Sequence, residues 1–241
     1  MGDNSFITAS CGGATIVWSF MLLLAFSLFL QVAAAAAQPV VVRTFEDDKV
    51  GAPPAGFVAA VGREGAADQW IVQREGKGRV LAHQGKSSPP DAFAVAIFTG
   101  AQYQDVEITV RLKATGGSRS AGLVWRYQDP LNHYAAQLDL AKQELAVYRV
   151  SGGNRIRIEH EDDLELDPEA WHSLRVVHED GEIRVYLGGI RVFGERDRRS
   201  RGPAGVGLWS SGDTTVMFDD FRIEDETEVP VRSGQTPSTK Q

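Results

Sequence analysis

Gly205-Val-Gly-Leu-Trp209, followed by Phe218-Asp-Asp-Phe221, is the most informative part of the sequence. Its apolar residues change phase, since Val216 and Phe218 share one face of a strand whereas Phe221 and Ile223 fall on the other. Side chains in a strand alternate between the two faces of a sheet. The change of phase therefore predicts one extra residue at Asp219-Asp220, which is a β-bulge in the strand that closes the domain.

Upstream of this stretch, and beyond Arg43, the chain is a series of short β-rich runs separated by turn signals, which is typical of a sandwich or barrel. No long segment has helical periodicity. The predicted strands are Val40–Phe45, Gln69–Arg74, Arg79–His83, Ala92–Phe98, Val106–Leu112, Ala121–Gln128, His133–Leu140, Glu144–Val150, Arg155–Glu159, Trp171–Val177, Glu182–Leu187, Ile190–Phe193, Val206–Trp209 and Thr214–Ile223. The sequence therefore predicts an all-β domain over residues 38–223.

The amino terminus predicts export. No charged residue lies between Asp3 and Arg43, and Ile16–Leu30 is almost wholly apolar before the alanine tract Ala33–Ala37. An apolar core followed by small residues is typical of a secretory signal peptide, here residues 1–37, and predicts a secreted or periplasmic protein. The alternative is an uncleaved membrane anchor formed by residues 14–37, because about 20 apolar residues span a bilayer.

Composition excludes several classes of site. The only cysteine is Cys11, so the mature chain has no disulfide, thiolate metal site or cysteine nucleophile. The net charge of −7 gives no reason to expect a nucleic-acid partner. Five arginines between Arg191 and Arg201 predict either a solvated loop or one that contacts an anion. Residues 224–241 are polar and contain two prolines, which predicts a disordered tail.

Two glycine turns predict how three consecutive strands pair. Asp180-Gly181 is a two-residue hairpin signal that pairs Val176 with Val185. Gly188-Gly189 then pairs Leu187 with Ile190 and Val185 with Val192. Both registers predict one buried face, made of Leu174, Val176, Ile183, Val185, Leu187, Ile190 and Val192, and an opposite row made of Arg175, Tyr186 and Arg191.

The same reasoning predicts a face rich in arginine further upstream. A turn at Asp129–Asn132 places Arg126 beside Ala135, and a short turn at Lys142 places Ala135 beside Arg149, with Tyr134, Ala136, Leu138, Ala146 and Tyr148 pointing inward. A bulged loop at Ser151–Gly153 then sets Arg149 opposite Arg155. The predicted ligand-binding residues are Arg126, Gln137, Arg149 and Arg155, with Arg157 on the same face and His133 at the rim.

Guanidinium groups fork onto carboxylates, phosphates or vicinal hydroxyls, which makes this face a candidate binding surface. The alternative is a solvated face neutralised by acids such as Asp139 and Glu159. If chemistry occurs there, His133 is the candidate acid or base.

Several motifs carry a family resemblance. They are Gly51–Phe57 after Phe45 and before Trp70, Gly122–Asp129 through Asn132–Tyr134, Val147–Val150, Trp171–Val176, Gly205–Trp209 and Phe218–Phe221. In order and spacing they resemble the bacterial 3-keto-disaccharide hydrolase-like domain, of the wider concanavalin A-like (laminin-G-like) jelly-roll group. The resemblance implies a two-sheet antiparallel jelly-roll sandwich linked with carbohydrate.

Three functions stay open on this basis. The first is a secreted domain that binds a glycan on the arginine face, and the second is a glycoside hydrolase acting on 3-keto or ordinary disaccharides. The third is a structural or surface-interaction role. The catalytic residues remain unknown: Glu161–Glu165 has the Glu-x-Asp-x-Glu letters of jelly-roll endoglucanases, but an acidic run before Asp167-Pro168 predicts an exposed loop.

The bulge also suggests a metal site. In related jelly rolls an acidic residue after the first strand often lies near the last strand, so the resemblance implies a calcium site formed by Glu46, with Asp47, and Asp219 or Asp220. Calcium takes several carboxylate and carbonyl oxygens. The alternative is a strand end whose carboxylates pair with Arg43 or Arg222.

Overall fold

The computed structural model describes residues 40–61, 70–85, 92–197, 199, 202–224 and 229–230. The predicted signal peptide and most of the predicted tail lie outside these residues. Within the tail, Val229–Pro230 forms the short strand β17, which pairs with β6 (Ala101–Gln102). Among the described residues, no helix is long and apolar enough to cross a membrane.

One sheet has eight strands. Its order is β14-β13-β12-β7-β16-β4-β3, and β1 also pairs with β16. The strands are β14 (Ile190–Arg196), β13 (Glu182–Leu187), β12 (His172–Glu179), β7 (Val106–Gly116), β16 (Thr215–Glu224), β4 (Gly78–Gln84), β3 (Trp70–Glu75) and β1 (Val41–Arg43).

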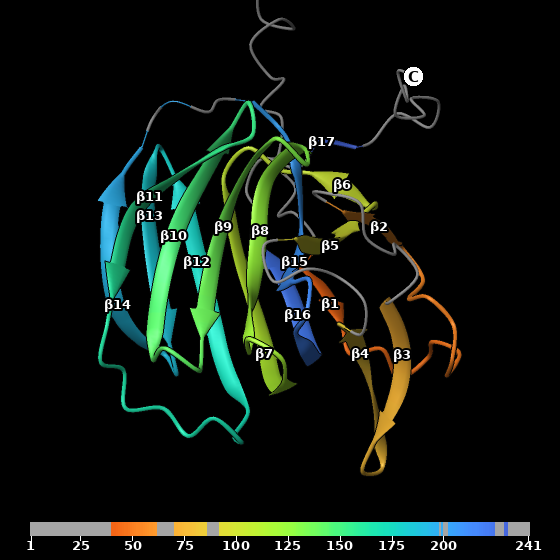
Figure 1. Cartoon of the computed structure of the whole chain (residues 1–241). Helices are drawn as coiled ribbons and strands as arrows, with labels where there is room; N and C mark the ends of the chain where they lie inside the picture. Colours follow the sequence, from red (N-terminus) through yellow and green to blue (C-terminus); the bar gives the residue numbers. More distant parts are fainter. Residues whose placement is uncertain are drawn as a thin grey trace, which may run out of the picture. The chain divides into compact units, whose positions relative to one another are not determined.

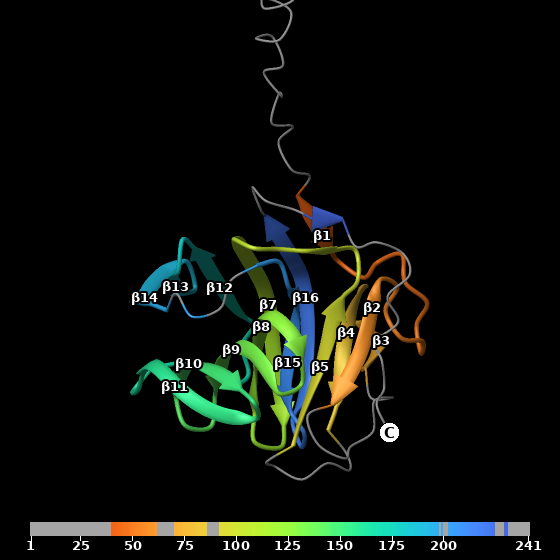
Figure 2. The same ribbon diagram turned by 90° about the horizontal axis from the view of Figure 1, so that it is seen from above.

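The second sheet has seven strands in the order β11-β10-β9-β8-β15-β5-β2. These are β11 (Asn154–Glu161), β10 (Glu144–Ser151), β9 (Asn132–Asp139), β8 (Ser120–Asp129), β15 (Gly205–Ser211), β5 (Phe93–Phe98) and β2 (Phe57–Val61). Every pairing in both sheets is antiparallel (Figure 1). Seen from above, β14–β12 and β11–β9 form two separate layers (Figure 2). The predicted all-β antiparallel sandwich is confirmed, and its core lies between the layers.

The predicted bulge in the closing strand is confirmed. Asp219 pairs with Arg111, but Arg222 pairs with Thr109, so β16 has one extra residue between these pairs. Asp220 adopts a left-handed backbone conformation (φ 50°). As a result Phe218 and Phe221 are both buried in the core although they lie three residues apart.

The pairing of β12 with β13 is also confirmed, including Val176 with Val185. The next hairpin pairs Leu187 with Ile190 and Tyr186 with Arg191, as predicted, but a bulge then pairs Val185 with Phe193 instead of Val192. The predicted burial of Ile190 is wrong, because β14 is the edge strand and this side chain remains 75% exposed.

The predicted register of β8, β9 and β10 is wrong. Ala135 pairs with Val124 and Tyr148, not with Arg126 and Arg149. The β9–β10 turn has four residues, closed by a hydrogen bond from the Lys142 backbone nitrogen to the Asp139 carboxylate. A shift of one residue moves every side chain of a strand to the other face. Tyr148 and Ala146 therefore lie on the outer face of the sheet, and Arg149 lies on the inner face beside Tyr134.

Two further local features separate the predicted arginines. A bulge in β8 between Trp125 and Asp129 includes Arg126 in a left-handed conformation (φ 47°), which turns its side chain inward. The β10–β11 turn has two residues instead of three, since Ser151 pairs with Asn154. Arg155 therefore lies opposite Val150, on the outer face, and not opposite Arg149.

Candidate functional site

The structure divides the predicted ligand-binding residues between two pockets. Gln137 and Arg155 line a pocket of about 600 Å³ on the outer face of the seven-stranded sheet, which we call the outer-face pocket. Arg126 and Arg149 line a pocket of about 520 Å³ at the ends of β8, β9 and β10, which we call the strand-end pocket. His133 lines both. The prediction that these residues share one face of the sheet is therefore wrong.

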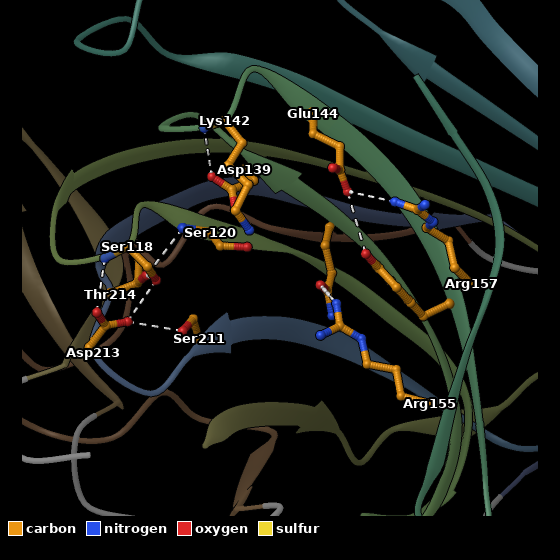
Figure 3. A network of polar contacts seen from close by, with 12 residues as sticks. Ser118, Ser120, Asp139, Lys142, Glu144, Arg155, Arg157, Ser211, Asp213 and Thr214 are labelled. Carbon is orange, nitrogen blue, oxygen red and sulfur yellow. Dashed lines mark hydrogen bonds and ion pairs between the residues drawn. The ribbon is translucent and has the colours of Figure 1, made fainter. Parts of the chain in front are cut away.

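One wall of the outer-face pocket is polar and is shown in Figure 3. The Arg155 guanidinium lies 3.6 Å from the ring centroid of Tyr148 and donates a hydrogen bond to the Gln137 amide oxygen. Arg157 lies 3.9 Å from Glu144, which also accepts a hydrogen bond from the Tyr148 hydroxyl at 3.4 Å. No ion pair joins Arg155 to another described residue, and Glu144 acts on its charge only from a longer distance.

Carboxylates hold the turns around this wall. Asp139 forms an ion pair with Lys142 at 3.0 Å. Asp213 accepts hydrogen bonds from the hydroxyls of Ser118 (2.6 Å) and Ser211 (3.0 Å), which line the pocket (Figure 3). Partial burial raises the pKa of the Asp213 carboxyl, but these hydrogen bonds outweigh it, and the net pKa lies below the usual value. The carboxylate therefore stays ionised and fixes this end of the pocket.

The opposite wall is aromatic. The rings of Phe93 and Trp209 stack with centroids 6.3 Å apart and planes 25° apart. The His133 ring packs 5.3 Å from Phe93 and 5.9 Å from Tyr127. Burial lowers the pKa of His133 to about 4, so the imidazole is neutral at pH 7. Its Nδ1 atom has no hydrogen-bond partner among the described residues.

The strand-end pocket has a different character, because its arginines join the two sheets. The side chains of Trp125 and Arg126, from β8, both donate to Nδ1 of His178 on β12, at 2.9 and 3.1 Å. Burial, and then the Arg126 charge, lower the pKa of His178 to about 4. Since Nδ1 accepts both bonds, the proton of this neutral imidazole lies on Nε2.

Arg149 forms the second link of this pocket. Its guanidinium pairs with Asp197, which follows β14, at 2.5 Å, and both side chains are close to nine-tenths buried. Asp197 also accepts the backbone N–H of Arg199 at 3.0 Å. We call Trp125, Arg126, Arg149, His178 and Asp197 the inter-sheet cluster.

Sequence reasoning missed the aromatic wall and the role of Tyr148. A signal for the outer-face pocket is present in β9, where His133, Ala135, Gln137 and Asp139 alternate on one face. A four-residue turn at Leu140–Gln143 would have placed Tyr148 beside Ala135 and shown the correct face. The prediction that Glu161–Glu165 forms an exposed loop is confirmed, since β11 ends at Glu161.

The carboxylates predicted to bind calcium have other contacts. Glu46 accepts the Arg79 backbone N–H at 2.9 Å, Asp219 accepts that of Asp220 at 2.8 Å, and Asp220 pairs with Arg111 at 3.1 Å. Burial, with the nearby charges of Asp220 and Glu46, raises the pKa of Asp219. Within the described ranges, no group of three or more His, Cys, Asp or Glu side chains is placed to hold a metal ion. Calcium binding at these residues stays a prediction that a calorimetric titration with calcium chloride tests.

Solved structures with the same architecture include sugar-binding and sugar-cleaving proteins. A carbohydrate-binding module from Bacillus subtilis is 17% identical, with a TM-score of 0.55 over 71% of this chain and 98% of that one. A β-1,3-1,4-glucanase (lichenase) from a mouse hindgut metagenome is 10% identical, with a TM-score of 0.53 over 79% and 100%. The β-glucanase of Bacillus licheniformis is 11% identical, with a TM-score of 0.51 over 79% and 99%. At these identities the likeness shows the jelly-roll fold.

Comparison with curated protein sequences gives no significant match. A family model does match, over residues 56–224, and its description is the 3-keto-alpha-glucoside-1,2-lyase-like domain. The match runs from β2 to β16, which is more than half of the chain and includes the strands that line both pockets. The resemblance found in the sequence motifs is thereby confirmed, and the chain belongs to the family of 3-keto-alpha-glucoside-1,2-lyase-like domains.

Proposed function

We propose that the outer-face pocket binds a carbohydrate. The observation that carries this proposal is the pairing of two unlike walls, one formed by Arg155, Gln137 and Glu144 and the other by Phe93 and Trp209. A sugar ring has the same division, with hydroxyls at its edge and C–H groups on its faces. Arginine and amide groups bind vicinal hydroxyls through paired hydrogen bonds, and aromatic rings cover apolar faces.

Size and charge support the same ligand class. The volume of about 600 Å³ lies within the range of small-ligand sites and is large enough for a mono- or disaccharide. Arg155 is held in place by Tyr148 and Gln137, and it forms no ion pair with a described acidic residue. A preorganised donor of this kind loses little conformational freedom when a ligand binds.

The comparisons with known proteins support carbohydrate as the class of ligand. One structural neighbour is named as a carbohydrate-binding module and two as glucanases, and the family description names a keto-glucoside as substrate. All of these ligands are sugars.

A glycan array tests the proposal, with the full chain and two variants. We expect binding to at least one oligosaccharide, and Arg155→Ala to lower the affinity about tenfold because it removes charge-assisted hydrogen bonds. Arg175→Ala is the matched control, since Arg175 lies 3.8 Å from the ring of Tyr186 on the outer face of the other sheet. Equal losses in both variants, or no glycan bound by the wild type, would contradict the proposal.

A second candidate function is the elimination that the family description names. The 3-keto group acidifies the C2 proton; a base removes it, the electron pair forms the C1=C2 bond, and the glycosidic C1–O bond breaks. The leaving oxygen then takes a proton from solvent. The favouring observation is His133, a neutral imidazole that lines the pocket. A neutral imidazole can act as a general base.

Turnover of a 3-keto-α-glucoside, followed as formation of the unsaturated product, tests this candidate. We expect His133→Gln to abolish turnover and to leave binding of the unoxidised glycoside within about twofold. Undiminished turnover in that variant would exclude His133 as the base.

We also propose that residues 1–37 export the domain, which brings it to extracellular oligosaccharides. Mass spectrometry of the protein from medium or periplasm, after expression of the full chain in a bacterium, should give an amino terminus near Gln38. A full-length product in the membrane fraction would support the anchor alternative.

A further inference from the structure

The strand-end pocket concentrates positive charge. Arg126, Arg149 and Arg199 line it, together with the polar side chains of Gln128, Asn132 and Ser151, and no described acidic residue does. Two nearby carboxylates form ion pairs with these arginines: Asp197 pairs with Arg149 at 2.5 Å, and Asp105 lies 3.8 Å from Arg126. No ion pair joins the exposed Arg199 guanidinium to a described residue. Arg126 and Arg149 thus have acidic partners, whereas Arg199 has none among the described residues; the Asp129 carboxylate, which accepts hydrogen bonds from the Asn132 side chain, lies beside the same pocket.

The backbone at Arg126 supports a ligand-binding role for this charge. A left-handed conformation is unfavourable for an arginine, yet Arg126 adopts it (φ 47°) inside the β8 bulge. The bulge turns the guanidinium to His178 Nδ1 and the Gly202 carbonyl, so that it is buried and fixed in the pocket wall. Bulges often re-aim a side chain next to a functional site, and strained residues cluster at such sites.

The two pockets are neighbours. His133 on β9 and Val150 on β10 line both of them, and these residues pair directly across the two strands. A ligand that lies against Arg155 in the outer-face pocket can therefore extend past His133 and Val150 to the three arginines. The sugar ring in the first pocket is neutral in our proposal, and the group that enters the second meets the exposed Arg199 guanidinium, which has no described acidic partner.

We propose that the strand-end pocket is an anion subsite that takes the carboxylate of an acidic sugar, while an adjoining ring of the same glycan occupies the outer-face pocket. This inference rests on the proposed carbohydrate binding and names its ligand class, a glycan that contains a uronic acid. Planar guanidinium groups fit a carboxylate through two parallel N–H···O bonds. Gln128 and Ser151 supply neutral polar groups for the hydroxyls beside it.

The test compares acidic oligosaccharides on a glycan array with their carboxyl-reduced, neutral counterparts. We expect the full chain to prefer the acidic member of a pair by about tenfold, and more salt to weaken this preference. Arg199→Ala should abolish the preference and leave the affinity for the neutral member unchanged, because the described hydrogen bond of Arg199 is made by its backbone N–H. Arg196→Ala is the matched control, since Arg196 is exposed on β14 and does not line the pocket.

A second measurement separates failure of this inference from failure of the proposed function. Titration with sodium glucuronate, followed through the arginine Nε–Hε signals by NMR, should shift Arg126 and Arg199, whether or not the outer-face pocket binds a sugar. If the protein binds neutral glycans through Arg155 but does not prefer the acidic glycan of a pair, the anion subsite is overturned and the proposed carbohydrate binding stands. A preference that survives Arg199→Ala, or sulfated glycans bound more tightly than carboxylated ones, would also overturn the carboxylate assignment.

Discussion

The two outer faces of the sandwich carry the same pair of side chains in different electrostatic settings. Arg155 covers Tyr148 at 3.6 Å on the seven-stranded sheet, and Arg175 covers Tyr186 at 3.8 Å on the eight-stranded sheet. Arg175 donates to both oxygens of Glu107 at 3.2 Å, so a carboxylate neutralises it. Arg155 donates to the neutral amide of Gln137 and lines a pocket. An arginine without an acidic partner can offer its charge to a ligand; of these two arginines, Arg155 is the one without an ion pair among the described residues.

The inter-sheet cluster contains buried arginines, and the largest effect on stability is expected there. Arg149→Ala removes the partner of Asp197 and leaves a nearly buried carboxylate alone. We expect the free energy of unfolding to fall by about 3–5 kcal/mol, because an unpaired buried charge is strongly unfavourable. Urea denaturation measures this, with Arg155→Ala as the control that should lose less than about 1 kcal/mol. A loss below about 1 kcal/mol for Arg149→Ala would show that its charge is not structural.

Lowering the pH tests whether protonation of the buried histidines destabilises the fold. Burial is the main cause that lowers the pKa of His83, His133 and His178 to about 4, below the ordinary value of 6.5. The unfolded chain therefore binds more protons between these values, and stability is full above pH 6.5 and lost as the pH falls towards 4. Each histidine contributes on the order of 3 kcal/mol to this loss. Urea midpoints at about pH 7.5 and about pH 5 measure it; an unchanged or higher midpoint at the lower pH would contradict the assignment.

Exchanging the partners of the two stacked arginines tests whether an acidic partner prevents an arginine from binding a sugar. Gln137→Glu gives Arg155 the acidic partner that Arg175 already has. We expect glycan affinity to fall about fivefold, or ~1 kcal/mol, since the guanidinium must then exchange a carboxylate for hydroxyls. Glu107→Gln makes the reverse change on the other sheet and should leave affinity unaltered. Calorimetry with the best oligosaccharide from the array measures both, and tighter binding by Gln137→Glu would contradict the role of the free charge.

The smallest effect is expected for an exposed ion pair on the outer face. Arg157 lies 3.9 Å from Glu144 and is 48% exposed, so Arg157→Ala should change the free energy of unfolding by less than about 0.5 kcal/mol. Thermal unfolding beside Arg149→Ala measures the contrast. A loss comparable with that of Arg149→Ala would remove the distinction between outer-face and buried arginines.

The sequence predicted those parts of the fold that are encoded by glycine turns and phase changes. Asp180-Gly181 predicted the β12–β13 register, and the spacing of Phe218 and Phe221 predicted the bulge. Both signals are local, and each constrains a buried face, which fixes the register strongly.

The candidate site was predicted only in part, because its geometry depends on backbone features without a sequence signal. Gln143 (φ 57°) and Arg126 (φ 47°) adopt left-handed conformations usually associated with glycine, so neither the turn nor the bulge was expected there. The bond between Trp125 and His178 joins residues 53 positions apart, which strand periodicity does not encode. The sequence therefore named residues that line the two pockets, but it placed Arg126 and Arg149 on the wrong face.

Sugar binding in the outer-face pocket requires Arg155, and not Arg175, to contact the ligand. NMR titration with the oligosaccharide that binds best on the array follows both arginines through their side-chain Nε–Hε signals. We expect a saturable shift of the Arg155 signal and none of the Arg175 signal. A shift of the Arg175 signal, or an unmoved Arg155 signal at saturation, would place the sugar elsewhere.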